Sequence, residues 1–206
     1  MEQNFTGQDS LRIINEMIGH ARNNFRKGAA NSSIFCGYFV ACTALLNFIL
    51  IYTLDNPLQS FWVWMLMFPM AVIANFIDYK RKKEEVVKTH IDAIVSAIWI
   101  AFPISVAIFL AVVFVTAYAI KSSYLGIVIT PTLLIMMGAA QYTTAIATRY
   151  RPYIYGAAVF WTGALLCGVA YLLGYPNFQF ILLAVCAVAG LSVPGHMLNK
   201  KAEKDV

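Results

Sequence analysis

The sequence is short of charge. Only 12% of its 206 residues are charged, whereas 60% are hydrophobic, and about a quarter of a typical soluble domain is charged. A soluble globule of this size keeps much of its chain at the surface, so it cannot bury so many apolar side chains. The composition therefore excludes an ordinary soluble fold and favours a protein of the lipid bilayer.

Several catalytic motifs are also absent. The chain has no HExxH zinc motif, no glycine-rich phosphate loop followed by lysine, and no CxxC pair. Its four cysteines, Cys36, Cys42, Cys167 and Cys186, all lie in apolar runs, and we interpret them as small packing residues rather than disulfides or zinc ligands. We therefore expect no cofactor and, on balance, no enzyme.

The apolar residues gather into six long runs. Each is close to the ~20 residues that a helix needs to cross a hydrocarbon layer, and helices satisfy their own backbone hydrogen bonds there. We predict an all-α bundle of six transmembrane helices, at Ile34–Leu54, Phe61–Ile77, Ala93–Ile120, Tyr124–Ala147, Tyr153–Gly174 and Phe178–Leu198. Pro69, Pro103, Pro131 and Pro194 lie in four different runs, where each removes a backbone hydrogen bond and favours a kink.

Basic residues are distributed unevenly around these runs. Fourteen of the fifteen Lys and Arg residues fall in the N-terminal segment, the second and fourth loops or the tail, and Lys121 is the exception. Basic residues near span ends stay on the cytoplasmic side. The stretch "DYKRKKEEVVKTHID", residues 78–92, is therefore interpreted as an orientation signal with both termini cytoplasmic. Its Glu84 and Glu85 and its lack of stacking aromatics beyond Tyr79 argue against a nucleic-acid partner.

The chain divides into three parts. Residues 1–33 form a polar N-terminal segment without a recognisable cleavable signal peptide, residues 34–198 the membrane domain, and residues 199–206 a cytoplasmic tail. Apolar residues at helical spacing in the first part predict an amphipathic helix at the headgroup level, with Leu11, Ile14, Ile18, Ala21 and Phe25 on its apolar face. Such a helix lies on the membrane or docks a cytoplasmic partner.

Polar residues collect in the half of the bundle predicted to be cytoplasmic. Two interpretations fit them: hydrogen bonds that join helices, or a polar vestibule that opens to the cytoplasm. The candidate binding residues are Asn75, Asp78, His90, Asp92, Gln141, Thr144 and His196.

The histidines suggest a narrower hypothesis. His90 and His196 lie near span ends on the same predicted side, and Asp78 or Asp92 could complete a zinc-like ligand set. Imidazole could instead act as a pH-sensitive switch, or pack at the membrane interface without a ligand.

Two short motifs carry a family resemblance. "LRIINEMIGHARNNF" near the N-terminus and "LSVPGHMLNKK", Leu191 to Lys201, with its Pro194-Gly195-His196, resemble an uncharacterised group of small bacterial polytopic membrane proteins. The first run differs, because "IFCGYFV" stands where that group has an aromatic motif. The resemblance implies the bacterial plasma membrane and supplies no activity.

Three classes of function remain. The leading one is a non-enzymatic regulatory or accessory component of a membrane complex, with a membrane or cytoplasmic protein, or a second copy, as partner. A small-molecule or ion transporter with a cytoplasm-facing vestibule is the alternative, supported by the prolines and by a weak repeat of spans one and two in spans five and six. An intramembrane metal-dependent enzyme is the third.

The predicted threading can be tested with single cysteines. A cysteine at Gln59 should react with a membrane-impermeant thiol reagent in intact cells, whereas one at Glu84 should react only after the membrane is opened. Labelling of the Glu84 site in intact cells would reverse the orientation.

Overall fold

The computed structural model describes residues 28, 30–83 and 90–204. The predicted N-terminal amphipathic helix, including Leu11, Ile14, Ile18 and Phe25, lies outside the described residues, as does Glu84. The described part is all-α, which confirms the predicted fold class.

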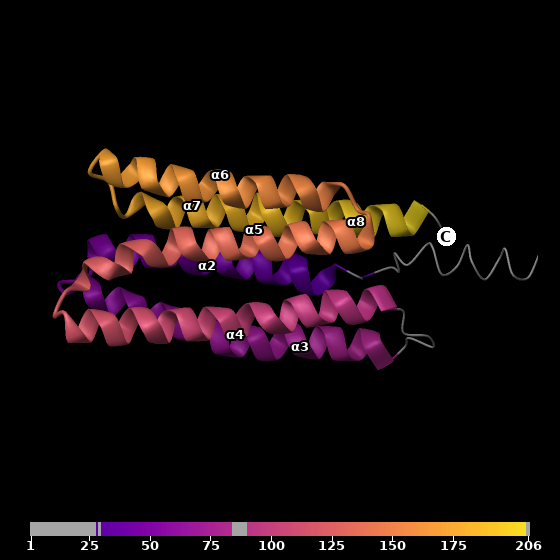
Figure 1. Cartoon of the computed structure of the whole chain (residues 1–206), viewed down its shortest axis with the longest axis horizontal. Helices are drawn as coiled ribbons and strands as arrows, with labels where there is room; N and C mark the ends of the chain where they lie inside the picture. The colour runs from indigo at the N-terminus through magenta and orange to yellow at the C-terminus, as the bar shows by residue number, and fades with distance from the viewer. Residues whose placement is uncertain (1–27, 29, 84–89, 205–206) are drawn as a thin grey trace, which may run out of the picture.

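Helical elements follow one another with short connections (Figure 1). They are α2 (Asn31–Thr53), the 3₁₀-helix η1 (Pro57–Leu66), α3 (Met67–Lys83), α4 (His90–Ala119), the 3₁₀-helix η2 (Ser123–Val128), α5 (Ile129–Thr148), α6 (Pro152–Leu172), α7 (Phe178–Ala187), the π-helical segment η3 (Val188–Ser192) and α8 (Val193–Lys204).

These elements make six candidate membrane spans within the described residues. η1 continues into α3, and α7, η3 and α8 run together as the last span. All six predicted spans are confirmed, with changed bounds. The second begins at Pro57 rather than Phe61, because a 3₁₀-helix precedes its α-helical part, and the last continues to Lys204.

The last span is at the centre of the packing. α7 contacts α2, α5 and α6, whereas α3 contacts α2 and η1. In the described part of the chain α4 contacts α5 and η2 but no other element. In the last span, 56% of an apolar 18-residue stretch is buried inside the bundle. In the two spans that contain α3 and α4, only 6% of the corresponding stretch is buried. The bundle is therefore a core of α2, α5, α6 and α7–α8, with α3 and α4 outside it (Figure 1).

Small residues allow the core helices to approach closely. The buried face of α2 carries Gly37, Ala41 and Ala44, and the buried face of α6 carries Gly156, Ala157, Gly163 and Ala164 among others. Large side chains fill the remaining space, and Phe160 and Leu134 are almost fully buried. Close packing and dispersion contacts hold such helices together, since lipid removes most of the hydrophobic driving force between them.

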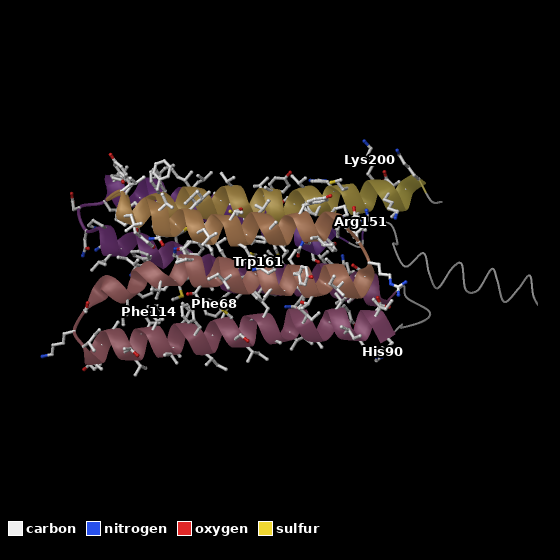
Figure 2. The ribbon with its side chains drawn as sticks, turned by 45° about the horizontal axis from the view of Figure 1, so that its top comes forward. Phe68, His90, Phe114, Arg151, Trp161 and Lys200 are labelled. Carbon is white, nitrogen blue, oxygen red and sulfur yellow. The ribbon has the colours of Figure 1, made fainter. Side chains whose placement is uncertain are left out.

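One end of the bundle carries most of the described basic residues, and we call it the basic end. His90, Arg151 and Lys200 lie there together (Figure 2). Beneath this end Tyr150 packs with Tyr153, their ring centroids 5.1 Å apart, and burial raises the pKa of the Tyr150 phenol. Which side of the membrane the basic end faces stays a prediction.

Candidate functional site

The strongest candidate site is a group of buried polar residues on α5 and on the π-helical segment η3, which a hydrogen bond from Gln141 to Gly190 joins. We define it by Gln141, Thr144, Gly190 and Ser192. The three side chains are at most 4% exposed, and Gln141 and Thr144 were both among the residues predicted from the sequence.

Pro194 explains why this cluster exists. Proline has no N–H, so residue 194 cannot donate the α-helical hydrogen bond to the carbonyl of residue 190, and its ring displaces that carbonyl. The helix responds with the wider π-turn of η3, in which the amide of Val193 donates to the carbonyl of Val188. A carbonyl without a donor costs several kcal/mol in a lipid-like interior. The Gly190 carbonyl therefore lacks the α-helical donor that residue 194 would otherwise supply, and a side chain of another helix can bond it.

Gln141 supplies that donor. Its Nε2 lies 3.1 Å from the Gly190 carbonyl oxygen, and this hydrogen bond joins α5 to η3. On the other side of the span, the Ser192 hydroxyl donates to the carbonyl of Ile34 in α2 at 3.2 Å. The π-helical segment is thereby hydrogen-bonded to two neighbouring helices.

A second proline produces the same arrangement at the opposite end of α5. Pro131 cannot donate to the carbonyl of Ile127, and the Tyr171 hydroxyl of α6 donates to that carbonyl instead. The same Tyr171 oxygen lies 2.8 Å from Gln179 Oε1 of α7. Here too, a carbonyl whose α-helical donor position is occupied by proline is bonded by a side chain from a neighbouring span.

Thr144 forms no hydrogen bond to another helix among the described residues. Its hydroxyl donates to the carbonyl of Ala140 in its own helix at 2.8 Å, which satisfies the buried hydroxyl within the helix. Gln141 therefore joins helices, whereas Thr144 does not.

The other predicted residues are dispersed. Asn75 is exposed, and its Nδ2 donates to the carbonyl of Ala71 in its own helix at 2.8 Å. Asp78 is half-buried on α3, and His90 and Asp92 are exposed in the first turn of α4. His196 is exposed on α8, where its Nε2 lies 3.2 Å from the Tyr38 hydroxyl.

The structure does not bring His90 and His196 to a common point. His90 begins α4, which has no contact with α8 among the described elements. Across the described residues no group of three or more His, Cys, Asp or Glu side chains could hold a metal ion. The zinc hypothesis thus finds no support in the placement of His90, His196, Asp78 and Asp92.

Two hollows on the described residues are surface depressions with almost wholly apolar walls, and neither has the polar lining of the predicted vestibule. One is lined by Ala170, Leu173, Tyr175 and Phe178, and the other by Ala111, Val112, Val115 and Thr116. None of the seven predicted polar residues lines either one.

Residues that the seven-residue prediction missed include Ser192, Tyr171 and Gln179. A signal for the contact of Tyr171 was present in the sequence. Counting back four residues from a proline inside a span identifies a carbonyl that lacks its α-helical donor, and Pro131 identifies Ile127 in this way, which Tyr171 bonds.

The fold defines the class of the protein. Six helices that are long and apolar enough to cross a bilayer, joined by short connections, make it an integral membrane protein in contact with lipid. Comparison with protein-family models, with curated proteins and with solved structures gives no match.

The contact between α6 and η3 leads to a stability prediction. A methyl group on Gly156 would lie 2.5 Å from the Gly190 carbonyl oxygen and 3.4 Å from Gln141 Nε2. Gly156→Ala should therefore lower the free energy of unfolding by about 1–3 kcal/mol, as overpacking does, measured by thermal unfolding of the reconstituted protein.

Gly168→Ala is the matched control. It lies on the same helix, and an added methyl group there meets nothing within 4 Å. It should leave stability unchanged or raise it by up to about 1 kcal/mol through helix propensity. Equal stability of the two variants would contradict the close contact of α6 with η3.

Proposed function

We propose that the protein is a non-enzymatic accessory or regulatory component of a membrane complex, and that its α4 helix binds a transmembrane helix of another membrane protein. The observation that carries the proposal is the exposed surface of α4. Val113 is the one buried residue in this 30-residue helix, although the helix contacts α5 along part of its length.

The exposed surface of α4 has two stripes with four-residue spacing. Ile100, Ile104, Ile108 and Val112 form one stripe and are 55–61% exposed. Small residues form the other, and Ala93, Ala97, Ala101 and Ser105 are all exposed. Small residues at this spacing let two helix backbones approach closely in a membrane, with β-branched neighbours packing beside them. Lipid chains alone do not require such a small-residue stripe.

The polar side chains support a non-catalytic role in a different way. Gln141, Ser192 and Tyr171 form hydrogen bonds between helices. They act as structural links of the core, which leaves the outer helices to carry the interaction.

The proposal includes a location. The resemblance of the N-terminal and C-terminal motifs to small bacterial polytopic proteins and the positive charge of the basic end support a bacterial plasma membrane with the basic end in the cytoplasm.

Photo-crosslinking in native membranes tests the proposed partner surface. A benzophenone amino acid at Ile104, beside the small stripe, should give one discrete protein adduct. The same group at Leu165, which is 72% exposed on α6, is the matched control and should give none. Ala97→Leu combined with Ala101→Leu should abolish the Ile104 adduct without lowering thermal stability, since both positions are exposed in the monomer.

Three results would count against it. Equal adducts from both positions, or no adduct from either, would contradict a specific surface on α4. An adduct between two differently tagged copies of this chain would show that α4 binds a second copy of the chain and not another protein.

A further inference from the structure

Among the described residues, Asn47 is a buried polar side chain whose amide forms no hydrogen bond. Its side chain is 0% exposed, and neither its Nδ2 nor its Oδ1 has a hydrogen-bond partner. It follows Ala41 and Ala44 on the buried face of α2. An amide with both polar atoms unpaired in a buried position is costly and uncommon in native proteins. A second arrangement of the neighbouring elements that gave this amide a hydrogen-bond partner would account for an asparagine at this buried position.

The neighbouring η1 has an unusual conformation. It is a 3₁₀-helix of ten residues, Pro57–Leu66, packed against α2. Runs of 3₁₀-helix longer than three or four residues are uncommon because their hydrogen bonds have poorer geometry, and they often mark hinges. The span that contains η1 and α3 is also little buried by the rest of the bundle. This span is therefore one of the two that can change at low cost to the core.

We propose that η1 converts between this 3₁₀ form and an α-helical form, and that in the α-helical form the amide of Gln59 binds the amide of Asn47. Gln59 and Ser60 are the polar residues of η1. In the present state Gln59 is exposed, whereas Ser60 is buried and its hydroxyl donates to the carbonyl of Pro57 at 2.7 Å.

Helix geometry determines the direction of the change. A 3₁₀-helix turns about 120° per residue and an α-helix about 100°, so conversion rotates each residue by about 20° relative to its neighbour. Gln59 precedes Met67, the first residue of α3, by eight positions. With α3 fixed, Gln59 turns by about 160° around the span axis. A side chain that is now exposed then faces α2.

The same conversion moves Gln59 to the depth of Asn47. A three-residue connection joins the end of α2 at Thr53 to Pro57, so these two ends lie at similar depths. Asn47 precedes Thr53 by six residues on α2. At a rise of about 1.5 Å per residue, it lies about 9 Å further from this end of the bundle than Thr53. Gln59 lies about 4 Å below Thr53 in the 3₁₀ form, and shortening of η1 by about 0.5 Å per residue carries it to about 8 Å. Two amides at one depth can form a pair of mutual hydrogen bonds.

Pro69 supplies the hinge. It stands in the first turn of α3 and cannot donate to the carbonyl of Met65 in either form. The backbone hydrogen bonding of the span is therefore interrupted between η1 and α3 whichever form η1 adopts. Conversion of η1 leaves the hydrogen bonds of α3 beyond this point intact.

Tryptophan side chains can report separately on η1 and on the other helices. The chain has four tryptophans; Trp62 and Trp64 lie in η1, whereas Trp99 lies in α4 and Trp161 in α6. In the present state the Trp64 ring lies 6.4 Å from the ring of Phe180, and conversion of η1 would rotate it away. Protein labelled with 5-fluorotryptophan and placed in lipid nanodiscs therefore separates a change in η1 from a change in the core.

The ¹⁹F spectrum should show two sets of resonances for Trp62 and Trp64 and single resonances for Trp99 and Trp161. Asn47→Leu and Gln59→Leu should each shift the populations of the two sets by roughly tenfold or more toward the present state, as expected for loss of a buried amide pair. Asn75→Leu, which removes an exposed amide of the same span that is bonded within its own helix, should leave their ratio unchanged. The Gln59→Leu variant is decisive. If η1 had no second state, replacing the exposed Gln59 would not change the populations of the two sets of resonances.

Single resonances for all four tryptophans in the unsubstituted protein would overturn the proposal without any variant. Two sets that persist unchanged in both Asn47→Leu and Gln59→Leu would overturn the amide pair.

Discussion

A backbone carbonyl that has lost its helical donor is the constraint on which this fold depends. Water is absent from the middle of a bilayer, so the donor must come from another side chain. Pro194 frees the carbonyl of Gly190, which receives its hydrogen bond from Gln141. Pro131 frees the carbonyl of Ile127, which receives one from Tyr171. Each proline thereby fixes which neighbouring helix must lie beside it.

Small residues make these hydrogen bonds reachable. Gly156 lets α6 approach the π-helical segment, and Gly190 itself faces the ring of Phe160. An interhelical hydrogen bond in a membrane contributes about 0.6 kcal/mol on average, so the links select the arrangement of the helices while close packing supplies most of its stability. The helices outside this system, α3 and α4, are correspondingly free to interact with other molecules or to change conformation.

The sequence predicted the six spans because a helix that crosses lipid needs an apolar run of defined length, and such runs are visible without tertiary information. It predicted polar cross-linking as one of two interpretations, and Gln141 fits that one. It could not show that His90 and His196 lie on elements without mutual contact, since the lateral order of helices leaves no periodic signal. The extended 3₁₀-helix at Pro57–Leu66 was also missed, because its composition is as apolar as that of an α-helical span.

The central claim is that α2 lies against the last span along its whole length, held in register by the core. Two residue pairs test this at opposite ends. Asn31 and Asn199 are joined by a 2.7 Å hydrogen bond at the basic end, and Tyr52 and Asn177 by one of 3.3 Å at the other. Cysteines at either pair, with Cys42 replaced by alanine, should be joined by a short bifunctional thiol crosslinker in membranes, whereas an Asn31–His90 cysteine pair should not. Crosslinking of the control pair, or of neither test pair, would contradict the arrangement of the helices described here.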